Sequence, residues 1–135
     1  MAVVEDLEQL PIFAGVGRDQ LATLAKYAEE QQVAAGARLT HEGAYEGPVY
    51  IVLDGWFAIE RDGRAVDTIG PGGFIGEIAA IDGGPRTATG RALQDSRVVV
   101  ISPRQFNDVL DAAPDLRAIV MAEMERRLEK IDQGG

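Results

Sequence analysis

Apolar residues follow a helical spacing at both ends of the chain. In residues 18–30 they recur three or four positions apart, as on one face of a helix: Leu21, Leu24, Ala25 and Ala28. A shorter helix is expected over residues 4–10. Residues 115–132 carry a longer stripe, formed by Leu116, Ile119, Val120, Met124, Leu128 and Ile131. The pattern therefore predicts helices before and after a different kind of middle segment.

The middle of the chain is typical of short strands. Residues 49–53 are strongly β-forming, and residues 56–61 and 64–69 are separated by Asp62-Gly63. Asp-Gly pairs, here and at Asp54-Gly55, supply the positive φ that tight turns need. Further strands are expected at residues 31–33, 38–41, 88–94 and 97–102. Short strands at even spacing predict a sandwich or barrel, of which a β jelly roll (double-stranded β-helix) is the most economical.

Ser102-Pro103 marks the return to helix, because serine is a favoured N-cap and proline fits the first helical position. Pro114 should separate a short helix from the long one. The result is a mainly β protein with flanking helices. We expect a single domain over residues 1–135, with N-terminal helices at about 4–30, a β-roll at about 31–102 and C-terminal helices at about 103–132.

Composition narrows the function classes. The chain has a net charge of −9, which disfavours nucleic acid as a partner. No apolar run approaches the length of a membrane span, and the acidic start resembles no signal peptide, so a cytoplasmic protein without a membrane partner is expected. It has one histidine and no cysteine, so we expect no metal site, no disulfide and no cofactor.

Residues 72–92 carry the most specific chemistry. Glycines open the segment, a short apolar run fills it, and Pro-Arg-Thr-Ala-Thr closes it. Glycines let backbone amides approach a ligand, and a helix start offers unpaired amides to an anion. Arg86 can donate two parallel hydrogen bonds to phosphate oxygens, and Glu77 can accept from a hydroxyl. The segment is therefore a candidate site for a phosphate-bearing ligand with hydroxyls.

This segment resembles the phosphate-binding cassette of the cyclic-nucleotide-binding domain family, which includes catabolite activators and protein kinase A regulatory subunits. The match runs through Ile-Gly-Glu-Ile-Ala, a spacer, and Pro-Arg-Thr-Ala-Thr. The resemblance implies a cyclic AMP or cyclic GMP ligand and a non-catalytic role. It assigns the ligand-binding residues as Gly76, Glu77, Ile78, Ala79, Pro85, Arg86, Thr87 and Ala88. Arg86 and nearby amides would hold the phosphate, Glu77 the ribose, and Thr87 the phosphate or base.

The resemblance extends to the last helix, which forms the dimer seam and the lid over the base in catabolite activators. A homodimer through this helix is therefore expected. The family's adenine-contacting threonine and serine correspond to Ile131 and Asp132, and its coupling leucine to Ala80. The sequence stops at Gly135, where the DNA-binding domain of a catabolite activator would begin, so no DNA-binding output is expected from these residues.

Three function classes compete. A cyclic-nucleotide sensor would move its terminal helices on binding and so signal to a downstream protein partner that the sequence does not identify. A degenerate module of the same fold would bind no nucleotide and serve protein–protein contacts. An enzyme of the metal-dependent β-helix type would need two or three histidines with a carboxylate, and the chain has one histidine. The sequence favours the sensor.

Overall fold

The computed structural model describes residues 3–40, 48–76 and 89–134. Its helices are α1 (Val3–Glu8), the 3-10 helix η1 (Pro11–Phe13), α2 (Arg18–Tyr27), α4 (Pro103–Ala112) and α5 (Pro114–Gly134). Its strands are β1 (Glu29–Val33), β2 (Arg38–Thr40), β3 (Val49–Asp54), β4 (Phe57–Arg61), β5 (Arg64–Ile69), β6 (Phe74–Ile75), β7 (Thr89–Ala92) and β8 (Ser96–Ile101).

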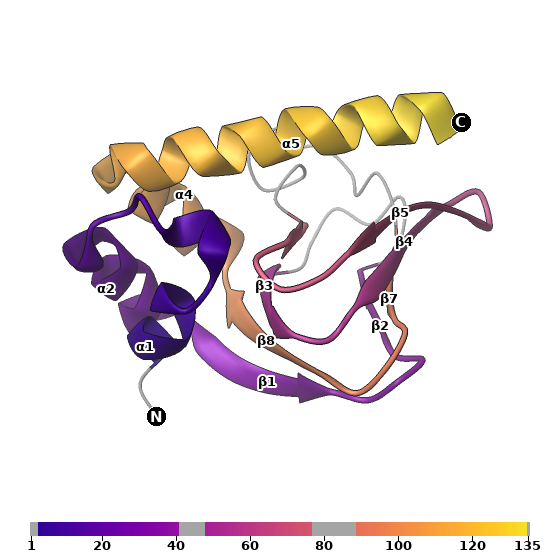
Figure 1. The fold of residues 1–135 in the computed structure, drawn as a ribbon, viewed down its shortest axis with the longest axis horizontal. Coiled ribbons are helices and arrows are strands. Elements are labelled where there is room, and N and C mark those ends of the chain that lie inside the picture. The colour runs from indigo at the N-terminus through magenta and orange to yellow at the C-terminus, as the bar shows by residue number, and fades with distance from the viewer. Residues whose placement is uncertain (1–2, 41–47, 77–88, 135) are drawn as a thin grey trace.

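The described strands form two antiparallel sheets. The first has the order β1-β8-β3-β6 and the second β2-β7-β4-β5. Helices α1, α2 and α4 gather at one end beside the first sheet, and α5 runs from that end along the roll toward β4 and β5 (Figure 1). The predicted fold class, a β jelly roll with flanking helices, is confirmed.

The first sheet is covered on both faces, which explains the unbroken apolar run of β3. Val49 and Ile51 pack among the helices, whereas Tyr50 and Val52 pack against the second sheet. Successive side chains of a strand point to opposite faces, so a strand between two layers needs apolar residues at every position. The described residues thus contain two cores, one under the helices and one between the sheets.

The two Asp-Gly pairs have different structural roles. Asp62 and Gly63 have φ values of 53° and 77° and close the tight turn between the paired strands β4 and β5, as predicted. Gly55 has a φ of 101° but leads from β3 in one sheet to β4 in the other, so it makes no hairpin. A Cβ placed on Gly55 would lie 2.0 Å from Oγ of Ser96, so the crossing requires glycine.

The end of the second helix differs from the prediction. The helix expected over residues 18–30 ends at Tyr27, because Glu29 and Glu30 pair with Val100 and Val99 of β8. Pairing in a sheet overrides the good helix propensity of glutamate. The ends of α4 are as expected: Ser102 Oγ accepts from the amide of Gln105 at 3.2 Å, and proline occupies the first helical turn.

Candidate functional site

The first flank of the candidate cassette is strand β6. Ile75 pairs with Tyr50 of β3, and both residues of β6 are buried. Gly76 follows with a φ of 91°, a conformation that side-chain-bearing residues rarely adopt. The chain therefore leaves the sheet through a glycine-dependent turn at the first residue assigned to the ligand.

The second flank is strand β7, which lies close to the first. Gly90 pairs with Ile59 of β4, and a Cβ placed on Gly90 would lie 3.1 Å from Cγ2 of Ile75. The next residue, Arg91, donates from Nη2 to Glu60 Oε2 at 3.1 Å across the same two strands. The side chain of Ile75 thus packs on the bare backbone of β7, so the segments on both sides of the cassette are held together.

Most of the predicted site residues lie outside the described residues. Gly76 is described and stands at the end of β6. Residues 77–88, which contain the other seven, are not described: Glu77, Ile78, Ala79, Pro85, Arg86, Thr87 and Ala88. The backbone of α5 is described through the positions of Ile131 and Asp132, but their side chains are not. The structure therefore places the frame of the candidate site, and the ligand contacts remain predictions.

An aromatic cluster joins this frame to the helices. Phe74, directly before Ile75, is fully buried. Its ring centroid lies 6.1 Å from that of Phe13 in η1 and 6.5 Å from that of Phe106 in α4, both in tilted or edge-on geometry. Sequence reasoning missed this cluster, because the three phenylalanines are far apart in the chain and carry no common spacing.

The long helix contacts the roll through charged side chains. Arg126 of α5 places Nη2 3.1 Å from Asp67 Oδ2 of β5 and 2.7 Å from Glu123 Oε1 of its own helix. Hydrogen bonding to Glu123, with the charge and hydrogen bond of Asp67 added, raises the pKa of Arg126 above its already high value. The guanidinium thus stays charged and bridges two carboxylates.

A hollow of about 240 Å³ lies next to this bridge. It is bounded by Ile12, the turn between β5 and β6, and the side chains of Glu123 and Arg126. The turn that lines it continues through β6 to Gly76. The hollow therefore lies between α5 and the turn that precedes β6, the strand that leads into the candidate cassette.

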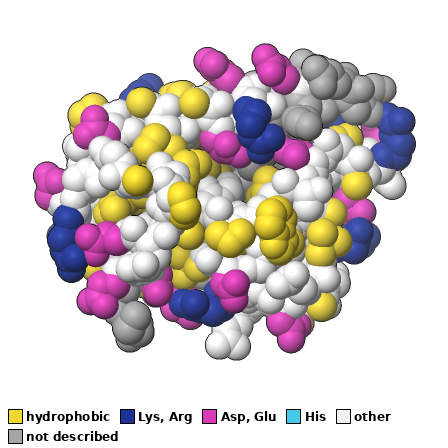
Figure 2. Space-filling model, in the orientation of Figure 1, with side chains coloured by type: hydrophobic (Ala, Val, Ile, Leu, Met, Phe, Trp, Pro, Cys, Tyr) yellow, Lys and Arg dark blue, Asp and Glu magenta, His cyan; other side chains and the backbone are white. Residues whose placement is uncertain are grey.

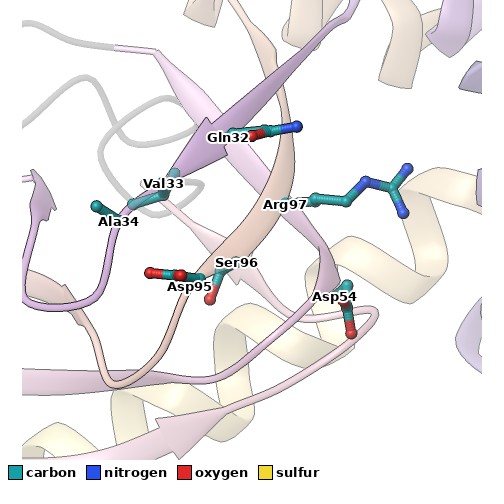
Figure 3. A pocket seen from close by; sticks show the side chains of 7 residues that line it. All are labelled: Gln32, Val33, Ala34, Asp54, Asp95, Ser96 and Arg97. Carbon is teal, nitrogen blue, oxygen red and sulfur yellow. The ribbon is translucent and has the colours of Figure 1, made fainter.

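A larger hollow, of about 500 Å³, is not a convincing ligand site. It is lined by Gln32, Val33, Ala34, Asp54, Asp95, Ser96 and Arg97. Asp95 and Asp54 lie on opposite sides of Ser96, and Arg97 extends away from Asp95 (Figure 3). Asp95 accepts from the amide of Ala35 at 3.0 Å, and Arg97 binds Glu30 and Asp6. These polar groups serve the surrounding turns and do not converge on a ligand.

The surface carries charges of both signs. Acidic and basic side chains lie near one another on the face in Figure 2, with hydrophobic ones gathered in its middle. Among the described residues no group of three or more histidine, cysteine or acidic side chains could hold a metal ion. None of the described helices has the length and hydrophobicity to cross a membrane.

Comparison with known proteins decides the family. The family model for the cyclic nucleotide-binding domain matches residues 30–113, which is more than half of the chain. The chain belongs to this family. The match begins in β1 and ends just after α4, so it contains both sheets and the candidate cassette.

Individual relatives agree with this assignment. An uncharacterized NTE family protein of Mycobacterium tuberculosis is 34% identical over 125 residues, covering 92% of this chain and 21% of that protein. A CRP-like cAMP-activated global transcriptional regulator of the same species is 27% identical over 131 residues, covering 93% of this chain and 58% of that one. This cyclic nucleotide-binding domain therefore spans about a fifth of the first relative and less than two thirds of the second.

Solved structures show the same fold. A structure of PKAR CBD2 bound to Sp-2Cl-cAMPS superposes with a TM-score of 0.82 at 20% identity, covering 95% of this chain and 86% of that one. At this identity the likeness concerns the arrangement of the backbone. It supports the jelly roll and the flanking helices as a shared architecture.

Proposed function

We propose that this domain is a non-catalytic sensor of cyclic AMP or cyclic GMP whose terminal helices rearrange on binding. The observation that carries the proposal is the cassette sequence, bounded by two strands of a cyclic nucleotide-binding fold and entered through a positive-φ glycine. A ligand that carries a phosphate and hydroxyls matches the donors and acceptors this sequence supplies.

The proposed contacts follow the chemistry of each residue. Arg86 and the amides of Gly76, Glu77, Ile78 and Ala88 hold the cyclic phosphate, Glu77 accepts from the ribose 2′-hydroxyl, and Thr87 contacts the phosphate or base. Ala79 and Pro85 complete the cassette. An arginine suits this role because its planar fork binds two phosphate oxygens, whereas a lysine offers one point charge.

The route from ligand to helices begins at β6. A ligand that pulls on the cassette shifts the end of this strand, where Phe74 packs between Phe13 and Phe106. Packed aromatic contacts do not deform continuously, so a small shift favours one arrangement of η1 and α4 over another. Binding acts as a switch only if the two helix arrangements differ in their affinity for the nucleotide.

The output is proposed to lie beyond these residues. One relative is named as a cAMP-activated transcriptional regulator, and the domain spans only part of that protein. We propose that this sensor likewise controls a partner protein or a further domain, that it acts in the cytoplasm, and that it pairs with a second copy through α5. Sedimentation of the chain with and without nucleotide tests the pairing directly.

The second candidate is a module that keeps the fold but binds no nucleotide. The replacement of the family's polar base contacts by Ile131 and Asp132 favours it. Such a module would serve protein–protein contacts through the same helices. The two candidates are distinguished by calorimetry, because only the sensor releases or absorbs heat when nucleotide is added.

The deciding experiment is calorimetric titration of the purified chain with cyclic AMP and with cyclic GMP. Arg86→Ala should weaken binding by about 2–5 kcal/mol, the scale for removing one partner of a buried charge pair, and Arg86→Lys should recover part of the loss. Arg104 is an exposed arginine on α4, so Arg104→Ala is the matched control. This variant should bind the nucleotides as the parent does. Absence of binding by the parent would support the degenerate module, and unchanged binding by Arg86→Ala would move the site elsewhere.

A further inference from the structure

Helix α5 is attached to the rest of the domain by two kinds of contact. Its first two turns belong to the helical core, where Leu116 and Val120 are fully buried. Gln20 of α2 adds polar contacts to this end: its Nε2 donates to Asp115 Oδ2 at 3.0 Å, and its Oε1 accepts from the amide of Leu116 at 3.4 Å. Residues 114–120 are therefore fixed in the bundle by apolar burial and hydrogen bonds.

The following turns are attached differently. None of residues 121–126 is buried, and the helix passes beside β5 at this point. The polar contact here is the ion pair between Arg126 and Asp67, with Glu123 as the second acceptor. The hollow of about 240 Å³ beside it separates Glu123 and Arg126 from the β5–β6 turn. Met121 and Met124 are half-buried, so over residues 121–126 it is the ion pair, and not a fully buried apolar side chain, that links α5 to the roll.

The ion pair joins an exposed cation to a shielded carboxylate, because the side chain of Arg126 is 42% exposed and therefore open to screening by salt. The side chain of Asp67 is only 8% exposed, and that of Glu123 is 15% exposed. The other oxygen of Asp67 accepts from the amide of Thr68 at 2.8 Å. If Arg126 were removed, the shielded carboxylate of Asp67 would lose its cation, which costs more than breaking a fully exposed pair but less than breaking a buried one.

We propose that Arg126 is a positioning residue whose ion pair with Asp67 holds residues 121–134 across β5 in the arrangement that binds the nucleotide. When the pair opens, this half of α5 leaves the roll while residues 114–120 stay in the bundle. The hollow beside Arg126 is lined by the turn that continues through β6 to Gly76, so this part of α5 lies beside the turn whose strand leads into the cassette. The link to the nucleotide rests on the proposed function, whereas the attachment of the helix does not.

Hydrogen exchange measured by mass spectrometry tests the attachment without any ligand. In Arg126→Ala the amides of residues 121–134 should exchange about threefold to tenfold faster than in the parent, and those of residues 114–120 should be unchanged. Asp67→Asn should give the same pattern, and the double variant should be no worse than the stronger single one. Arg126→Lys should recover part of the protection.

The matched control is Arg117→Ala on the same helix, whose ion pair with Asp111 joins α5 to α4 and not to the roll. It should leave exchange of residues 121–134 as in the parent. Raising the salt from about 0.05 M to about 0.5 M should speed this exchange in the parent but hardly in Arg126→Ala, because salt screens the pair. Unchanged exchange in Arg126→Ala would overturn the attachment.

Titration with cyclic AMP tests the link to the ligand. Arg126→Ala and Asp67→Asn should weaken binding by about threefold or more through faster dissociation, whereas Arg117→Ala should stay within about twofold of the parent. Faster helix exchange with unchanged affinity would overturn the assignment of this arrangement to binding. If the parent binds neither nucleotide, the proposed function and the ligand link both fail, and the exchange data alone then support or overturn the attachment.

Discussion

The contact between Phe74 and Phe106 gives a prediction whose size follows from the structure. Both side chains are fully buried, and their ring centroids lie 6.5 Å apart. A tilted aromatic pair contributes about 0.5–1.5 kcal/mol beyond its buried area. Phe106→Leu removes one such pair, and Phe74→Leu removes two, because Phe74 also meets Phe13. The lost ring pairs should lower the free energy of unfolding by about 0.5–1.5 kcal/mol in the first variant and about 1–3 kcal/mol in the second, in addition to the cost of the smaller side chain in the core.

The assay is a double-mutant cycle in urea, followed by circular dichroism. Phe74→Leu and Phe106→Leu together should be less destabilising than the sum of the single effects, by about 0.5–1.5 kcal/mol, since the shared pair can be lost only once. Phe57→Leu is the control, because Phe57 is equally buried but belongs to the core between the sheets. Its effect should add to that of Phe106→Leu within about 0.5 kcal/mol.

Additivity of the Phe74 and Phe106 variants would refute the reasoning, because it would mean that the rings do not stabilise one another. If the two rings are coupled as expected, nucleotide affinity should also depend on Phe106. On the proposed function, Phe106→Leu should change nucleotide affinity although α4 contributes no residue to the cassette, and Phe57→Leu should change it less.

Further predictions concern the cassette and one surface ion pair. Glu77→Ala should bind a 2′-deoxy cyclic nucleotide about as well as the parent does, because the lost contact is to the missing hydroxyl; a large remaining difference would give Glu77 another role. Cyclic AMP and cyclic GMP should bind within about tenfold of each other, and Thr87→Ala should cost cyclic GMP about 0.5–1.5 kcal/mol more than cyclic AMP; equal losses in paired titrations would confine Thr87 to the phosphate. A hydrogen bond from Arg97 lowers the pKa of Glu30 below its ordinary 4.5, so the pair stabilises the fold above that pH and less as pH falls through the lowered value. Both side chains are about one third exposed, so Glu30→Gln should cost less than about 1 kcal/mol at neutral pH, and the difference should vanish in acid unfolding below the lowered value.

Local chemistry in the sequence was enough to predict much of the frame. The turn at Asp62-Gly63 and the cap at Ser102 depend on residues within a few positions of one another, and both are confirmed. The strongly β-forming residues 49–53 predicted a strand, and the structure has β3 at Val49–Asp54. The cassette pattern identified the family, which the match over residues 30–113 confirms.

Tertiary structure decided the features that join distant segments. Glu29 and Glu30 lie in a strand because β8 offers its edge to them, which the helical pattern before them could not reveal. The clustering of Phe13, Phe74 and Phe106 depends on how η1, β6 and α4 meet. Likewise, Arg126 and Asp67 are 59 positions apart, and each is an ordinary charged residue in its own segment. Sequence spacing encodes periodicity within an element, whereas contacts between elements arise only when the chain folds.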